Sequence, residues 1–366
     1  MEERQVYWVA LNLVLSEKLR IAQKIIRQYS SLEEVFRTPW KELVSLGLDE
    51  ERARTISSPK ILRHAQKEID RLQKKGYSLF TLEDQNYPGL LKEIYDPPFV
   101  LYCAGSVGIW QDPTVAVIGA RKPSPYGRAV AERLAEDLAS RGIVVVSGLA
   151  RGIDSIAHWG ALKGGKTIAV LGSGLENIYP PENRRLAQKI SENGAVISEY
   201  PLDAEPLGFH FPQRNRIIAG LSSALVVVEA SRKSGSLISA GLALEQNREV
   251  MAVPGNVTVE LSRGTNWLIK NGAKPVEDWE DVAEEFPSPL RERLLFQKDI
   301  RPPELPFLAP KEKQILNLLQ VDALVHIDTL LENCEYSISE LLTVLLDLEL
   351  KGLIVQSPGK YFQRRM

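Results

Sequence analysis

Short segments rich in glycine and arginine hold the residues of this 366-residue chain that could do chemistry. Glycine lets a backbone approach a ligand closely, and the guanidinium group of arginine binds phosphate oxygens in pairs. One such segment alone is most often a tight turn with a surface arginine, but its recurrence along the chain favours an anion site. The first two segments contribute Gly119, Arg121, Lys122, Ser147, Gly148 and Arg151.

A third segment, residues 211–216, combines aromatic and guanidinium groups at a predicted helix start. Arginines hold phosphates and aromatic rings stack on bases, although Phe211 in a core is the more frequent arrangement. Residues two apart on a helix point about 200° away from each other. We therefore predict that only one of Arg214 and Arg216 faces a ligand, while the other pairs with a carboxylate. Asn215 is a candidate cap for this helix.

Two further glycine-bearing segments extend the candidate set. Ser234, Gly235 and Ser236 offer hydroxyl and amide groups at a predicted helix N-terminus, which is a neutral seat for an anion. Gly172 and Gly174 follow another predicted strand and approach a dinucleotide-binding turn, with Glu199 as a possible ribose acceptor. Because the third glycine of that turn is missing, we do not predict a cofactor.

Residues 160–167 match the Walker A pattern, but their context argues against a phosphate loop. Such a loop leaves a strand and opens a helix, whereas here a helix precedes and a strand follows. The chain shows no Ser-His-Asp order, no nucleophile elbow and no paired histidine ligands. We predict no catalytic residue and no metal site, so we expect that the protein is not an enzyme.

Composition favours a soluble, cytoplasmic protein of two or three domains, with no apolar run long enough for a membrane span and no secretory signal pattern. Its two cysteines are far apart, which argues against a disulfide framework. The net charge of −2 hides an asymmetry: residues 113–277 carry 19 basic and 15 acidic side chains, whereas residues 278–366 carry 10 and 16. The middle of the chain is therefore the better place for an anion.

Six apolar, β-branched runs alternate with helical stretches from residue 114 onward, at 115–119, 143–148, 167–172, 195–199, 224–230 and 249–254. This alternation predicts an α/β fold with an extended Rossmann-like, doubly wound and mainly parallel sheet. Ligands of such sheets bind at the carboxyl ends of the strands. The candidate segments follow these strands, so we expect one shared crevice.

The flanking segments predict two further domains. Residues 1–76 show short helices at 16–28, 31–37, 40–46 and 60–75, and prolines between 87 and 102 predict an extended connector into the domain at 77–285. A proline-rich linker at 286–307 precedes a winged helix at 308–366. Its third helix is acidic rather than basic, which favours a protein contact over base reading.

The glycine- and arginine-bearing segments of the middle domain resemble those of the DNA-processing protein A family, also called DprA or Smf. The resemblance spans residues 87–285 and rests on the segments 119–121, 147–154, 179–180, 211–216, 234–236 and 252–255. It implies a sterile-alpha-motif-like (SAM-like) N-terminal domain and a winged-helix extension. It also implies a recombination mediator that binds and protects incoming single-stranded DNA in natural transformation, helps load RecA, and forms a homodimer through the Rossmann-like domain.

By position, the resemblance places DNA binding on Arg121, on the loop at 147–151 and on residues 211–216. The chain has Gly208 where many relatives carry a basic residue, so one phosphate contact is expected to be absent or supplied elsewhere. The segment 267–270 is a candidate dimer surface. Two other functions stay open: a nucleotide-cleaving enzyme of the lysine-decarboxylase-like Rossmann group, whose Pro-Gly-Gly-x-Gly-Thr loop is missing here, and a protein scaffold built around the winged helix.

Overall fold

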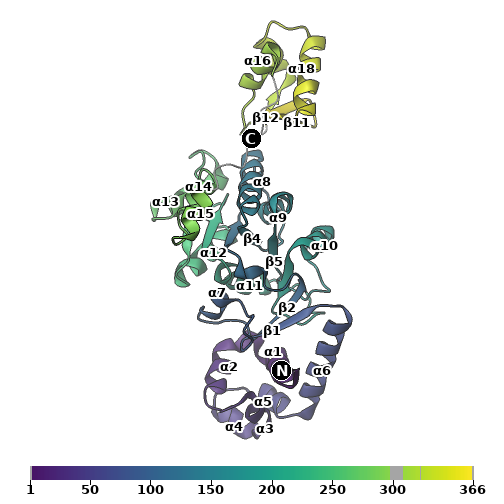
Figure 1. Ribbon diagram of the computed structural model, residues 1–366, viewed down its shortest axis with the longest axis vertical. Helices are drawn as coiled ribbons and strands as arrows, with labels where there is room; N and C mark the ends of the chain where they lie inside the picture. The colour runs from purple at the N-terminus through teal and green to yellow at the C-terminus, as the bar shows by residue number, and fades with distance from the viewer. Residues whose placement is uncertain (1, 297–307, 322, 365–366) are drawn as a thin grey trace.

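The computed structural model describes residues 2–296, 308–321 and 323–364. Figure 1 shows a helical bundle that contains the N-terminus, a central α/β part, and a small C-terminal domain at the opposite end. Within these ranges, no helix combines the length and the apolar character that a membrane span requires.

The central sheet has nine strands in the order β1-β2-β6-β5-β4-β3-β7-β8-β9. In this order, the seven strands β6-β5-β4-β3-β7-β8-β9 run parallel to one another. The six predicted apolar runs correspond, in chain order, to β3, β4, β5, β6, β7 and β8. Strand order reverses between β3 and β7, which confirms the doubly wound fold. The bounds are β1 Ser78–Thr81, β2 Val100–Gly105, β3 Thr114–Ile118, β4 Val144–Ser147, β5 Thr167–Val170, β6 Ala195–Ser198, β7 Ala224–Val227, β8 Glu249–Ala252 and β9 Lys274–Pro275.

The extended connector is only part of what lies between residues 77 and 105. Here the chain forms β1, the short helix α7 (Gly89–Lys92) and β2, which joins the sheet antiparallel to β6. Pro97 and Pro98 lie just before β2. Residues 100–103 of β2 are fully buried. The antiparallel edge was therefore missed because its strand follows prolines that signal a loop.

Alternating side chains of each strand face two helical layers. Val115 and Val117 of β3 pack with α8 and α9, whereas Ala116 and Ile118 pack with α11, α12 and α13 on the other face. This period of two, with both faces apolar, is what a parallel sheet covered on both sides requires. The helices are α8 Pro125–Ser140, α9 Ile153–Gly164, α10 Arg184–Asn193, α11 His210–Gly220, α12 Gly235–Glu245, α13 Arg263–Lys270, α14 Trp279–Ala283 and α15 Leu290–Phe296.

The Walker-like stretch is a helix seam. Its first five residues end α9, and Thr167 begins β5, as the sequence context predicts. A Cβ at Gly160 would lie 2.3 Å from the carbonyl oxygen of Glu132 in α8, and one at Gly164 would lie 2.5 Å from that of Glu136. These glycines therefore let two helix backbones touch, and the motif reports packing rather than phosphate binding.

We expect Gly160→Ala to lower the free energy of unfolding by about 1–3 kcal/mol, because the added methyl group overpacks the seam. Gly241→Ala is the matched control, since Gly241 also lies inside a helix but a Cβ there meets nothing within 4 Å. The control should be neutral or stabilising by up to about 1 kcal/mol. Urea denaturation of both variants measures the difference, and equal stability of the two would contradict the seam.

The N-terminal bundle shares its hydrophobic core with the sheet. Its α1 was not predicted as a helix, yet Trp8 and Leu11 of this helix are buried in one cluster with Phe99 and Tyr102. The rings of Trp8 and Phe99 have centroids 5.9 Å apart. The helices of the bundle are α1 Glu2–Leu15, α2 Leu19–Ile26, α3 Leu32–Arg37, α4 Trp40–Ser45, α5 Glu50–Ile56 and α6 Pro59–Lys74.

Polar contacts fix the same boundary. Asn12 donates to the carbonyl oxygen of Glu199 at 2.9 Å, and the amide of Leu202 donates to Glu68 at 2.6 Å. Arg71 of α6 pairs with Glu176 and Asp203 of the central part at 2.9 and 3.0 Å. Bundle and sheet are therefore joined by both apolar and charged groups.

The C-terminal domain has its own core and the predicted winged-helix elements. Its three helices pack over a small sheet of strand order β10-β12-β11. These elements are α16 Pro310–Leu318, β10 Val325–His326, α17 Ile327–Glu332, α18 Ile338–Leu350, β11 Ile354–Ser357 and β12 Tyr361–Arg364. The predicted linker at 286–307 lies partly outside the described residues, and its described beginning contains α15.

Candidate functional site

A crevice lies at the carboxyl edge of the sheet, where strand order reverses between β3 and β7. It consists of a hollow of about 300 Å³ and a smaller one of about 50 Å³, which share Arg121, Ala150, Phe211 and Arg214. Most of the predicted site residues line it: Gly119, Arg121, Gly148, Arg151, Phe211, Arg214, Asn215, Ser234, Gly235 and Ser236. The strand-end segments therefore meet, as the doubly wound fold predicts.

Two glycines lock the Arg121 loop against the start of α9. A Cβ at Gly119 would lie 2.7 Å from Ile153, and one at Gly152 would lie 2.3 Å from the carbonyl oxygen of Ala120. The amide of Ile153 donates to that same oxygen at 3.1 Å. Because Gly152 also has a φ of +79°, side chains are excluded here both by space and by backbone conformation. The exposed guanidinium of Arg121 thus projects from a fixed backbone.

Arg214 forms the floor of the crevice. It is 4% exposed and donates to the carbonyl oxygens of Gly148, at 2.6 Å, and Val170; Gly148 directly follows β4, and Val170 ends β5. Burial lowers the pKa of Arg214 to about 10, against the opposing charge of Asp154, so the side chain stays charged at neutral pH. A Cβ at Gly148 would lie 2.6 Å from this guanidinium, which explains the glycine.

Asp154 holds the second loop in place rather than pairing with Arg151. Its carboxylate accepts from the amides of Gly148 and Ala150 at 3.2 and 3.4 Å. Burial raises the pKa of Asp154, and the charge of Arg214 partly offsets this rise. Arg151 instead forms an ion pair with Glu182 at the surface, which raises the pKa of Arg151. Asp154 and Arg151 therefore serve different partners, although they lie only three residues apart.

An aromatic pair forms one wall. The ring of Phe211 lies 5.5 Å from that of Tyr179, which is 41% exposed, and both line the crevice. Gly172 lies beneath Phe211, because a Cβ there would be 2.9 Å from its ring. Phe211 is thus a partly exposed surface ring rather than a core residue. Tyr179 was missed as a site residue, although its position after β5 matches that of the other strand-end segments.

The N-terminus of α12 forms the opposite wall. The hydroxyl of Ser234 accepts from the amide of Ser236 at 3.2 Å and caps the helix. A Cβ at Gly235 would meet nothing within 4 Å, so the backbone there is open. An uncharged helix start with free space in front of it suits an anionic group.

Five predicted residues lie outside this lining. Lys122 is exposed beside the crevice. Gly172 lies beneath the ring of Phe211, which lines the crevice. Ser147 is fully buried and donates to the carbonyl oxygen of Val117 at 2.7 Å. A Cβ at Gly174 would lie 2.1 Å from the carbonyl oxygen of Pro201, so this glycine serves chain packing. DNA contact by these residues stays a prediction.

Arg216, the fifth, turns away from the crevice, as expected for one member of its pair. It is 6% exposed and forms ion pairs with the buried Glu199 and, at 3.5 Å, with Asp96. This pairing also removes Glu199 as a ribose acceptor. The capping prediction for Asn215 is wrong, because α11 begins at His210, five residues earlier.

The dinucleotide-like turn at 172–177 is filled by the chain itself. The amide of Gly174 donates to Ala204 at 2.9 Å, and the side chain of Asn177 donates to the carbonyl oxygen of Asp203 at 2.6 Å. Segment 201–204 therefore packs on this turn and takes up the Gly174 amide that a bound phosphate would need. Within the described residues, no cluster of metal-ligating side chains is found.

The acidic groups near the crevice are already engaged. Glu229, two residues after β7, is 2% exposed and accepts from the amide of Ser124 at 2.9 Å and from its hydroxyl. Asp154 is held by two backbone amides. His158 is fully buried, and burial lowers its pKa to about 3. The two carboxylates, Glu229 and Asp154, fix the backbone, and their hydrogen bonds leave them little capacity for proton transfer.

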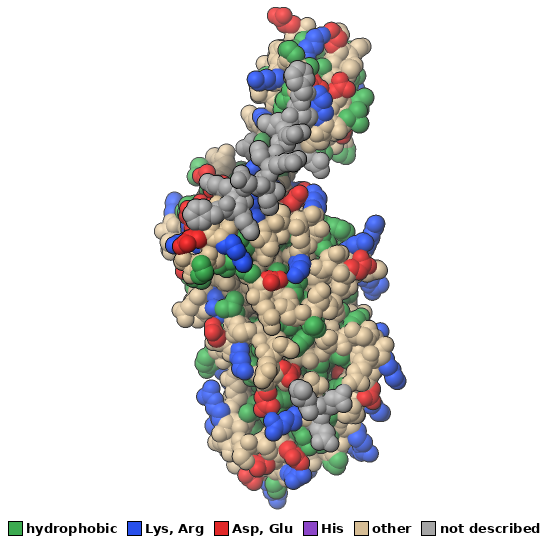
Figure 2. Space-filling view, in the orientation of Figure 1, with side chains coloured by type: hydrophobic (Ala, Val, Ile, Leu, Met, Phe, Trp, Pro, Cys, Tyr) green, Lys and Arg blue, Asp and Glu red, His purple; other side chains and the backbone are tan. Residues whose placement is uncertain are grey.

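The third helix of the winged domain, α18, presents apolar and acidic side chains. Leu342, Leu346 and Leu350 are 47%, 56% and 78% exposed, and they follow one another at intervals of four along one face. Figure 2 shows hydrophobic side chains and both signs of charge on this domain. The composition of α18 is therefore poor for reading base edges.

The sequence model of the DNA recombination-mediator protein A family matches residues 78–287, and that of the DprA winged helix domain matches residues 300–360. Protein Smf of Escherichia coli is 40% identical over 302 residues, which cover 80% of this chain and 79% of that protein. DNA processing protein DprA of Streptococcus pneumoniae is 47% identical over 208 residues, or 57% and 73% of the two chains.

Solved structures agree with the fold. The X-ray structure of DNA processing protein A from Streptococcus pneumoniae superposes with a TM-score of 0.67 at 37% identity, over 77% of this chain and 97% of that one. The protein of the same name from Helicobacter pylori, studied for its single-stranded DNA binding mode, gives a TM-score of 0.53 at 34% identity. That match covers 60% of this chain and 96% of the other.

Proposed function

The chain belongs to the DNA recombination-mediator protein A family, and we propose that its crevice binds single-stranded DNA without reading the base sequence. The observation that carries the proposal is the exposed Arg121 beside the aromatic pair Phe211 and Tyr179. Cations that track phosphates and rings that stack on bases are the two parts of a sequence-tolerant single-strand site.

The crevice supplies each part of this chemistry from a different segment. Arg121 gives an exposed positive charge, buried Arg214 adds a second charge below it, and the open start of α12 gives uncharged donors. The missing basic residue at Gly208, which lines the crevice, is compensated in this proposal by Arg121 and Arg214. We propose that the exposed Lys122, next to Arg121 in the chain, adds a further phosphate contact.

The related DNA-processing proteins support a role for this chain in processing incoming DNA. By the same proposal, the protein protects the strand, passes it to RecA in the cytoplasm, and acts as a homodimer through the central domain. The half-exposed Trp267 of α13 is the candidate for that contact. The apolar, acidic α18 would meet a protein rather than DNA.

A nucleotide-cleaving enzyme is the alternative that the fold allows. It needs a carboxylate free to act on the substrate, but Glu229 and Asp154 are both buried and hydrogen-bonded to the backbone. Ser234 to Ser236 also stand where that enzyme group has its Pro-Gly-Gly-x-Gly-Thr loop. Binding without chemistry is therefore the better proposal for the crevice.

The proposal is tested by fluorescence anisotropy with a labelled oligothymidine and with a hairpin duplex. We expect the oligothymidine to bind more tightly, with the logarithm of its association constant falling by about 0.7 per released phosphate contact for each tenfold rise in salt. A labelled acidic peptide with a net charge similar to that of the oligothymidine is the control for attraction by charge alone. Affinity that does not change with salt, or an equal preference for the duplex, would overturn the proposal.

A further inference from the structure

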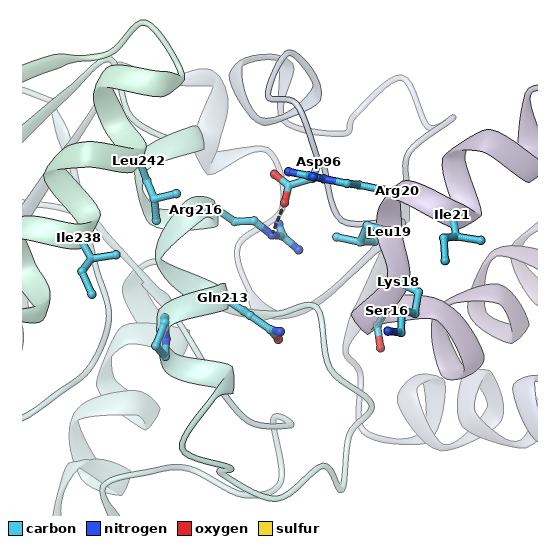
Figure 3. A pocket seen from close by; sticks show the side chains of 11 residues that line it. Ser16, Lys18, Leu19, Arg20, Ile21, Asp96, Gln213, Arg216, Ile238 and Leu242 are labelled. Carbon is cyan, nitrogen blue, oxygen red and sulfur yellow. Dashed lines mark ion pairs between the residues drawn. The ribbon is translucent and has the colours of Figure 1, made fainter. Parts of the chain in front are cut away.

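Apart from the crevice, a separate hollow of about 560 Å³ opens between α2 of the bundle and the helices α11 and α12 (Figure 3). We call it the interdomain groove. Leu19 points into it from one side, and Ile238 and Leu242 point into it from the other. Ile238 and Pro212 line both this groove and the crevice. The two hollows are therefore neighbours that share a wall.

The groove has an apolar interior and an ion-pair cluster at its floor. Arg216 lies there between the carboxylates of Glu199 and Asp96, so its single positive charge is already engaged. Its Nη1 has no hydrogen-bond partner among the described residues, and such buried donors are rare. An apolar slot with one unused donor suits a flat base with carbonyl oxygens better than it suits a phosphate.

Beyond the groove, a further hollow of about 540 Å³ follows the exposed side of α2. Arg20 lines both hollows and lies over the ring of Tyr95, 5.1 Å from its centroid. Tyr95 is 72% exposed, although aromatic rings of this size usually have buried surface. An exposed ring in a basic hollow is a platform for a base.

The cations beside these hollows lie on one helix and its ends. Lys18, Arg20, Lys24 and Arg27 are all exposed. In the described part of the chain, none of them forms an ion pair, whereas many other surface cations do. Four unpaired positive charges beside apolar and aromatic surface favour a polyanion that carries bases over an acidic peptide, which would bring no rings to stack.

We propose that the interdomain groove continues the path of the single strand from the crevice onto the N-terminal bundle. Bases enter the apolar slot and stack on Tyr95, and phosphates follow the cations of α2. This inference rests on the proposed function, because it needs a strand in the crevice. It gives the N-terminal bundle a direct role in binding that its helical fold alone does not suggest.

The experiment compares a short oligothymidine of about 6 nucleotides, sized for the crevice, with one of about 30 nucleotides, sized for the whole path. The groove variant is Arg20→Ala with Lys24→Ala in the full chain. The matched control is Arg63→Ala with Lys67→Ala, which removes two exposed cations from α6 of the same bundle. Circular dichroism verifies that all proteins are folded, and anisotropy gives the affinities.

We expect the groove variant to bind the long strand about 10-fold more weakly, with a salt slope shallower by about 1.4 for two lost phosphate contacts. Its affinity for the short strand should equal that of the unchanged protein, and the control should match the unchanged protein for both. Equal long-strand affinity of groove variant and control overturns the inference alone. Failure of the unchanged protein to bind either strand overturns the proposed function as well.

Discussion

Replacing Arg121 by alanine is expected to weaken binding of a single-stranded oligonucleotide by about 10- to 100-fold. A hydrogen bond to a charged group contributes about 1.5–3 kcal/mol, and about 1.4 kcal/mol corresponds to a factor of ten. Arg121 lines both hollows of the crevice and forms no ion pair with any described residue. Its loop is held in place by the close contacts of Gly119 and Gly152. The loop therefore cannot rearrange to compensate for the lost side chain, and the affinity measures the guanidinium contact.

Arg133→Ala is the control for this effect, because it removes another exposed arginine, one that pairs with Asp137 at 3.7 Å in α8, outside the crevice lining. Both variants should keep the free energy of unfolding of the unchanged protein within about 0.5 kcal/mol. If the two variants lose affinity equally, the positive charge acts from a distance and the crevice is not the binding site. Anisotropy titrations at two salt concentrations separate these outcomes.

Replacing Arg216 by methionine should lower the free energy of unfolding by about 3–5 kcal/mol, the effect of breaking a buried ion pair from one side. The variant leaves Glu199, 2% exposed, without its cation. Burial already raises the pKa of Glu199, and Arg216 opposes that rise. In the variant the carboxyl group must therefore be buried either charged and unpaired or protonated.

The double variant Arg216→Met with Glu199→Leu identifies the cause. Removing both charges with side chains of similar volume should restore most of the lost stability, because the desolvation penalty disappears with the pair. Chemical denaturation of the single and double variants gives the coupling between the two residues. A double variant no more stable than Arg216→Met would show that packing, rather than charge, fixes α11 against the sheet.

Most of the central fold could be predicted from sequence, because its signal is local. Each of the six apolar runs is long enough to be recognised alone, and their alternation with helices leaves few topologies. β1 and β2 could not be predicted in this way: β2 follows Pro97 and Pro98, and its place depends on pairing with β6, almost 100 residues later. Helix α1 was missed because its buried face is packed by distant residues.

The site follows the same division. Arg121 and Gly148 were predicted from a strand end and a glycine, and both line the crevice. The spacing of Arg214 and Arg216 showed that their side chains point in different directions, but it did not show which of the two faces the crevice. That choice depends on Glu199 and Asp96, which come from a different strand and from the segment after α7. The groove residues of α2 gave no sequence signal at all, because their partners lie in another domain.

The common core of bundle and sheet has a consequence for the energetics of association. Trp8 packs against Phe99, and Arg71 bridges to Glu176 and Asp203, so the two walls of the interdomain groove belong to one cooperative unit. A ligand that enters between them meets a preorganised surface and does not pay the conformational entropy of closing a hinge. The rate of its capture should then be set by diffusion and charge, with no preceding domain motion.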